Sequence, residues 1–280
     1  MAVLLTLNTP IRDQRDAGRI LDETLRDAPA GSTVEIPSGT FLLPSGPDVV
    51  PPTLRSNVTI RGAGMDKTIL FQDRFKQDGK YCAFEFTPGL AYENMTLDTS
   101  HTAGVQMLTA GWSWPGNSGK ATLRRVCVRG ATCSLYSWGE PLGHCEVEAH
   151  ECRFQGASWV VSIGESTGPD CVYYDLHRCT IDGDFEKYGP GAGHTEFAML
   201  VGLLARGGRI RAYDCGITCR GTTKHKLVCG AWTTNVDSGA DWGKGEWPYM
   251  PLTDCHITII PNGAAEEVPT KVTIGRIDQR

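Results

Sequence analysis

The chain has 280 residues and a formal net charge of -5 at pH 7, and 21% of its residues are charged. This balance gives no reason to expect nucleic acid or an anionic membrane as a partner. No apolar run is long enough to span a bilayer, so we expect no membrane insertion. The start, Met1–Leu7, lacks a basic region and is soon followed by Pro10, which is not typical of a signal peptide.

The N-terminal residues 1–30 are interpreted as an arm followed by a capping helix. The helical pattern over residues 13–27 places four apolar residues on one face, namely Ala17, Ile20, Leu21 and Leu25. Pro29 and Gly31 end the helix. A helix at this point would cover the first coil of the remaining domain, residues 31–280, whose open end would otherwise expose strand edges.

A short sequence motif, called a phrase below, recurs along this domain. It has one apolar residue on each side of a residue that is mostly polar. Its first apolar column is Val58, Met95, Val126, Cys152, Cys179, Cys215 and Cys255. Its second apolar column is Ile60, Leu97, Val128, Phe154, Ile181, Ile217 and Ile257. A period of two indicates a strand with one buried face, and its recurrence predicts a solenoid with one coil per repeat.

An apolar run closed by glycine follows the middle copies, at residues 107–111, 136–139, 161–164, 199–202 and 227–230. These runs have no 3.6-residue period and are rich in Val, Ile, Cys and Phe, so they predict strands rather than helices. A further strand precedes the middle Cys phrases, at residues 122–124, 147–149, 172–174 and 210–212. The sequence therefore predicts three strands per coil.

The chain has 11 cysteines, four of which lie in the first buried column. Buried cysteine packs as a small apolar residue, and stacked strands rarely align neighbouring thiols for a disulfide, so we expect free thiols and a reducing site of synthesis. Cys215 and Cys219 are spaced as a CxxxC pair and His177 lies near Cys179, which suggests zinc, but the spacings do not pair two such units. We expect no metal site.

Residues 31–41 and 54–70 carry the pattern strand, Pro-x-Gly-x-aromatic, strand, Gly-x-Gly-x-x-x-Thr. This resembles the pectin-lyase-like superfamily, which includes polysaccharide lyases, hydrolases and phage tail spikes. The resemblance implies an all-β, right-handed parallel β-helix of about seven or eight coils, but no particular activity. Gly62–Gly64 is no nucleotide loop, because the strand Thr68–Leu70 follows where a helix would be needed. We expect no cofactor.

The residue before the first apolar column is polar in every copy: Asn57, Asn94, Arg125, Glu151, Arg178, Asp214 and Asp254. Its sign alternates from Arg125 to Asp214. This predicts an outward ladder of charges between coils, worth a few tenths of a kcal/mol per pair.

The turn after the glycine-ended strand is the first candidate site. Glu140 and Glu165 follow glycines taken as equivalent on adjacent coils, so their carboxyl groups are predicted to lie close enough to act as a catalytic pair. Trp112 and Trp114 would supply faces for sugar rings. The structural alternative is that the two glutamates are solvated turn residues.

The glycine-rich insertion at residues 182–196 is the second candidate site, with Asp184, His194 and Glu196 as substrate-binding residues. The alternating acids at its start lack the glutamate that would complete a calcium loop. The catalytic motifs of polygalacturonases, pectate lyases and mannuronan epimerases are incomplete in this chain. An ordered surface loop is the structural alternative.

Two functions follow. The first is a virion component of the tail or tail-fibre type, whose flank binds a host-surface polysaccharide and whose other partners are virion subunits. The alternative is a free polysaccharide lyase or glycoside hydrolase acting on an acidic polysaccharide. We expect the protein in the virion or at its cytoplasmic site of synthesis.

Overall fold

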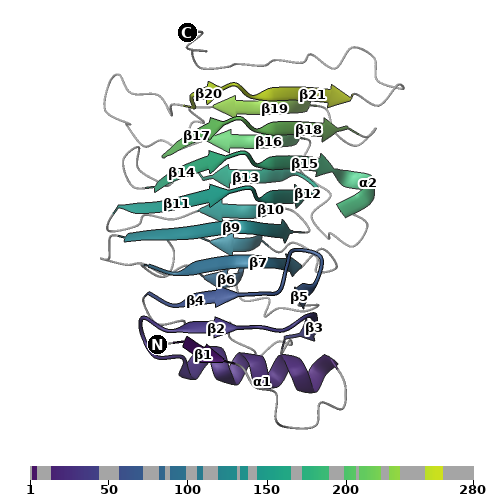
Figure 1. Ribbon diagram of the computed structural model, residues 1–280. Helices are drawn as coiled ribbons and strands as arrows, with labels where there is room; N and C mark the ends of the chain where they lie inside the picture. Colours follow the sequence, from purple (N-terminus) through teal and green to yellow (C-terminus); the bar gives the residue numbers. More distant parts are fainter. Residues whose placement is uncertain are drawn as a thin grey trace.

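The computed structural model describes residues 2–4, 14–43, 57–71, 82–85, 89–98, 106–109, 119–130, 133–137, 144–164, 172–188, 199–205, 208–221, 227–233 and 250–260. These residues form a stack of parallel strands with a helix across one end (Figure 1). Every strand pairing that the structure describes is parallel, as in the register of Phe154 with Ile181. The predicted parallel β-helix is therefore confirmed.

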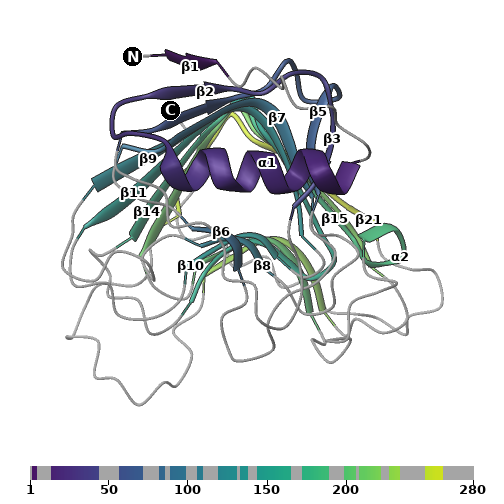
Figure 2. The same cartoon turned by 90° about the horizontal axis from the view of Figure 1, so that it is seen from below.

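The helix α1 (Gln14–Asp27) covers the N-terminal end, as predicted. It lies across the space between the two sheets when the molecule is viewed along the stack (Figure 2). Leu21 and Leu25 are buried against the core. Gly18 allows close approach to β3, because a Cβ there would lie 1.8 Å from the Leu42 carbonyl oxygen. No described helix is long and apolar enough to cross a membrane.

The larger sheet has two arms joined at a corner. The first arm contains β1 (Ala2–Leu4), β2 (Thr33–Glu35), β4 (Thr59–Arg61), β7 (Ala91–Asp98), β9 (Gly119–Arg129), β11 (Cys145–His150), β14 (Val172–His177), β17 (Arg209–Tyr213) and β20 (Leu252–Thr253). The second arm contains β3 (Gly39–Leu42), β5 (Thr68–Phe71), the C-terminal halves of β7 and β9, β12 (Arg153–Gly156), β15 (Thr180–Asp184), β18 (Gly216–Arg220) and β21 (His256–Ile260).

The corner between the arms is a single residue in the left-handed region. From β7 onward the corner residues are Asn94, Arg125, Glu151, Arg178, Asp214 and Asp254, with φ between 50° and 56°. One such residue turns the chain sharply and directs its side chain away from the core. These positions are the predicted charge column.

The sequence pattern aligns Asn57 with Asn94 as the first member of that column, and this alignment is wrong. Thr59 and Ile60 pair with Ala91 and Tyr92 in the first arm, so the Asn57 phrase does not correspond to the Asn94 phrase in the second arm. Asn57 also has a positive φ, of 59°. In this coil, Asn57 therefore places a left-handed polar residue before a first-arm strand, as Asn94 does before the second arm of its own coil, and the sequence pattern does not distinguish the two.

The second sheet contains β6 (Cys82–Glu85), β8 (Gln106–Thr109), β10 (Cys133–Ser137), β13 (Trp159–Ile163), β16 (Met199–Ala205) and β19 (Leu227–Thr233). It matches the predicted glycine-ended runs, but β16 and β19 continue beyond their glycines. Because Ile163 pairs with Ala205, Gly164 and Gly202 are not equivalent. Gly202 and Gly230 are in register, because Val201 pairs with Cys229 and Leu203 with Ala231. Gly202 instead allows close packing, since a Cβ there would lie 2.6 Å from Ile217. This sheet is described for six strands, so the number of coils stays a prediction.

The core lies between the sheets and contains the cysteine column. The side chains of nine cysteines are described, and all nine are free. The thiols of Cys179 and Cys215 lie 3.4 and 3.3 Å from the carbonyl oxygens of His177 and Tyr213, two residues earlier. Cysteine thus fills the corner and donates weakly to a carbonyl group there.

Candidate functional site

The outer face of the first arm is solvent-accessible and carries polar side chains in register. Alternation along β11 buries Val147 and Ala149 and turns Glu148 and His150 outward. The same position runs through consecutive strands as Glu35, Arg61, Glu93, Arg124, His150, His177 and Tyr213. Chemically different groups therefore lie roughly 4.8 Å apart along one flat face.

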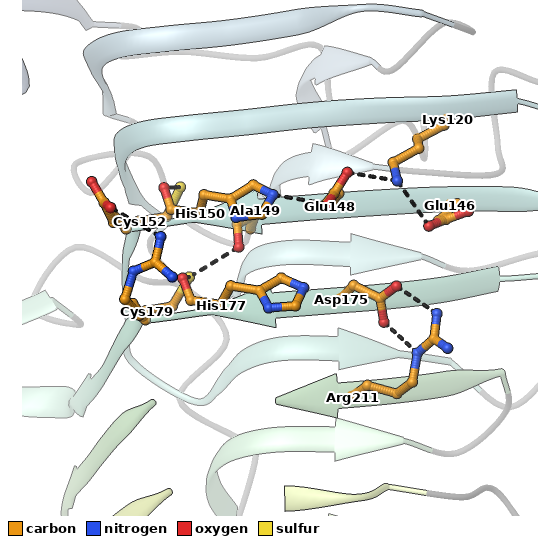
Figure 3. Close-up of polar contacts among 12 residues, drawn as sticks. Lys120, Glu146, Glu148, Ala149, His150, Cys152, Asp175, His177, Cys179 and Arg211 are labelled. Atoms are coloured by element: carbon orange, nitrogen blue, oxygen red, sulfur yellow. Dashed lines mark hydrogen bonds and ion pairs between the residues drawn. The ribbon is translucent and has the colours of Figure 1, made fainter. Parts of the chain in front are cut away.

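A chain of three side chains crosses this face (Figure 3). Lys120 Nζ lies 2.5 Å from Glu148 Oε2 and 3.2 Å from Glu146 Oε1. Glu148 Oε1 lies 2.9 Å from His150 Nε2. The hydrogen bond from Lys120 lowers the pKa of the Glu148 carboxyl, against the opposing effect of burial. Glu148 is therefore ionised, and it fixes the orientation of the imidazole ring.

The orientation of His150 decides which nitrogen is available. In the neutral ring, Nε2–H donates to Glu148, so the Nδ1 lone pair remains as the acceptor. A carboxylate that holds one imidazole nitrogen while the other meets a substrate is the arrangement found in catalytic dyads and triads.

His150 begins a stack of rings along the coil axis. Its ring centroid lies 4.9 Å from that of His177, which lies 4.9 Å from that of Tyr213, with interplanar angles of 11° and 9°. Burial, followed by the charge of His150, lowers the pKa of His177. Burial and this charge therefore favour the neutral form of His177, and its ring packs against that of His150.

Charged pairs complete the face beside the stack. Arg211 forms a two-pronged ion pair with Asp175, and the guanidinium carbon of Arg209 lies 5.4 Å from the ring centroid of Tyr173. These contacts fix the side chains around His177. Among the residues that the structure describes, no group of His, Cys, Asp and Glu could hold a metal ion.

Most of the residues predicted for the site fall outside the part of the chain that the structure describes. Those that fall outside the described residues are Glu140, Glu165, Trp112, Trp114, His194 and Glu196. The equivalence of Gly139 and Gly164, from which the glutamate pair was predicted, is not tested, because Gly139 lies outside the described residues; the described strands pair Ser137 with Ile163. The roles of these residues stay predictions.

Asp184 is the one predicted site residue that the structure describes. Its Oδ1 accepts a hydrogen bond of 3.1 Å from the Lys187 amide, and its Oδ2 lies 3.8 Å from Arg220 Nε. It therefore caps α2 (Phe185–Tyr188), a short helix within the predicted insertion. A substrate-binding role for Asp184 stays a prediction.

Sequence reasoning did not single out Glu148 or His150 as site residues. The signal that points to them is the set of alternate, outward-facing residues in the strand before each Cys phrase. It reads Glu146, Glu148 and His150 on one coil, and Tyr173, Asp175 and His177 on the next. The two outward residues Glu148 and His150 are visible in this alternation, and the register shows what lies beside them on the neighbouring coils.

No protein-family model matches the chain, and no curated protein matches it. Two solved structures from Azotobacter vinelandii are similar, the A-modules of the mannuronan C-5 epimerases AlgE6 and AlgE4. The first has 15% identity and a TM-score of 0.37 over 88% of this chain and 83% of that chain. The second has 13% identity and a TM-score of 0.36 over 88% and 85%. Similarity at this level does not say what this chain does.

Proposed function

We propose that the protein acts on an extended polysaccharide bound along the outer face of β9, β11, β14 and β17, with His150 as a general base in a lyase reaction. The observation that carries the proposal is the 2.9 Å contact between His150 Nε2 and Glu148 Oε1 on an accessible flat face. The resemblance of residues 31–70 to the pectin-lyase-like superfamily supports a polysaccharide as the substrate.

An elimination matches the groups on this face. The Nδ1 atom of His150 takes a proton from the sugar carbon next to the carboxylate. The electron pair left behind forms a carbon–carbon double bond, and the glycosidic oxygen departs and takes a proton from water. Glu148 holds the ring and stabilises the imidazolium that forms. General-base catalysis of this kind contributes about 10²- to 10⁴-fold to a rate.

Hydrolysis matches this face less well. A glycoside hydrolase needs one carboxyl group kept protonated as the acid, which requires a raised pKa. The pKa of Glu148 is lowered instead, because Lys120 donates to it. The lyase alternative is therefore favoured over the hydrolase. Attachment to a host polysaccharide by a virion component stays a prediction that these contacts do not test.

The test is an assay for unsaturated products on a panel of uronic-acid polysaccharides. His150→Gln should lower the rate by about 10²-fold or more, and Glu148→Gln should also lower it. His256→Gln and Glu93→Gln are matched controls: His256 is exposed on β21, and Glu93 lies on the same face and is held by Arg61 at 2.7 Å. Full activity in His150→Gln, with loss in a Glu140→Gln/Glu165→Gln double variant, would move the site to the flank predicted from sequence.

A further inference from the structure

A pocket at the corner between the two arms has a volume of about 180 Å³. The residues that line it are Arg124, Arg125, His150, Glu151 and Arg178. Three guanidinium groups therefore face one small space on the surface of a chain whose net charge is -5. Such a concentration of positive charge needs an explanation.

The fold brings the three arginines together from two coils. Arg124 is the last outward residue of the first arm of β9, and it pairs in register with His150 on β11. Arg125 and Arg178 are corner residues on either side of Glu151, with φ of 50° and 51°. The backbone, rather than a flexible loop, thus directs these side chains outward at the same corner.

The corner ladder accounts for only part of this charge. Glu151 lies 3.1 Å from Arg178 and 4.0 Å from Arg125, both measured between nitrogen and oxygen atoms. Arg125 Nε also donates to Asn94 Oδ1 at 2.7 Å. One carboxylate therefore faces three guanidinium groups, which leaves an excess of two positive charges at the pocket.

Arg124 is the surplus member. It is exposed, and within the described part of the chain it forms no ion pair and no side-chain hydrogen bond. Its register neighbour Glu93 is already bound by Arg61 at 2.7 Å, and its other neighbour, His150, uses Nε2 on Glu148. A ladder that only stabilised the coils would not need Arg124.

We propose that this pocket is an oxyanion subsite that binds an acidic substituent of the glycan, a carboxylate or a sulfate ester, through Arg124 and Arg178. The planar guanidinium fork matches two oxygens of such a group, and charge-assisted hydrogen bonds of this kind are short and strong. This deepens the proposed function, on which the identity of the ligand as a sugar rests: it names the residues that would hold the acidic group and places that group beside His150, which lines the same pocket.

The test measures binding by calorimetry at low ionic strength to a uronic-acid oligosaccharide, a sulfated oligosaccharide and a neutral oligosaccharide, with sodium sulfate and sodium acetate as simple anions. Arg124→Gln should weaken binding of the acidic ligands by about 10-fold or more, and Arg178→Gln should act in the same direction. Arg124→Lys keeps the charge without the fork and should recover part of the affinity. Arg220→Gln, an exposed arginine on β18, is the matched control.

The two acidic oligosaccharides distinguish the sources of the anion, since the tighter one identifies the substituent. Equal affinity for the neutral oligosaccharide, equal effects of Arg124→Gln and Arg220→Gln, or no binding of any anion would each overturn the inference. Its failure is separable from that of the lyase proposal. If anion binding depends on Arg124 but no product forms, the subsite proposal stands and the lyase proposal fails. If product forms and Arg124→Gln does not change its rate, the lyase proposal stands and the subsite proposal fails.

Discussion

Glu151 and Arg178 occupy the same corner on consecutive coils, and Glu151 Oε1 lies 3.1 Å from Arg178 Nη2. Both residues have left-handed backbone conformations, with φ of 55° and 51°. The corner position thus both turns the chain and places a side chain on the surface. This links the backbone of the corner directly to the arginine pocket, because the turn determines where Arg125 and Arg178 point.

The corner conformation makes a prediction at Asp214, whose φ is 52°. Asparagine tolerates this conformation, whereas a β-branched residue is strained in it. Asp214→Val should be less stable than Asp214→Asn by about 1–2 kcal/mol. Urea unfolding of the two variants measures the difference. Equal stabilities would show that the corner relaxes out of the left-handed region.

The sequence predicted the repeat, the capping helix and the cysteine column, because all three depend on apolar periodicity. It did not separate the two corners of a coil, since Asn57 and Asn94 precede the same kind of phrase. It also placed the glycines of β13 and β16 in one column, although the register pairs Ile163 with Ala205. Register depends on contacts between coils, and turns of variable length conceal it from the sequence.

The second apolar column is tested at Ile181, which is 1% exposed and pairs with Phe154 and Ile217 on the adjacent coils. Ile181→Ala should lower the free energy of unfolding by about 2–5 kcal/mol, because it leaves a cavity in the core. Thr180→Ala, at the exposed neighbouring position, is the control and should change stability by less than about 0.5 kcal/mol. A loss below about 1 kcal/mol at Ile181 would contradict its inward orientation.

The thiols give a third prediction. Eight of the nine described cysteines are buried. A hydrogen bond with Cys179 raises the pKa of Cys215 to about 11, and burial raises the pKa of Cys219 to about 12. Because the thiolate is the reactive form, native protein should react slowly with a thiol reagent. Protein denatured without reductant should expose at least the nine described thiols. Oxidation of most of them would contradict the free column.

The candidate site was harder to predict than the fold. Glu148 belongs to one column of outward residues, and His150 and Arg124 belong to another. Outward residues show no apolar period that marks them. They form a candidate site only through contacts between coils, such as that of Lys120 with Glu148, which are 28 positions apart in the sequence. Such contacts cannot be predicted until the register of the coils is known. The residues proposed from sequence came from turns, where composition is conspicuous but position cannot be inferred.

The last prediction concerns the acid side of the stability profile and rests on His177. Its ring faces His150 and Glu148 on β11, Tyr213 on β17, and Asp175 and Arg178 on its own chain segment. Burial and the charge of His150 lower its pKa below the ordinary value of 6.5, despite the opposing carboxylates.

Between the lowered pKa and about 6.5, the unfolded chain binds more protons at His177 than the folded chain does. The free energy of unfolding should therefore fall as the pH decreases through about 6.5. His177→Phe keeps a ring in the stack but cannot be protonated, so its stability should fall less over the same range. Glu148 does not interfere, because its lowered pKa acts below the ordinary value of 4.5. Urea unfolding of both proteins at several pH values from about 7.5 to 5.5 measures the two slopes. Parallel slopes would mean that the folded protein accepts the proton at His177 without cost, and that the ring stack does not hold this histidine neutral.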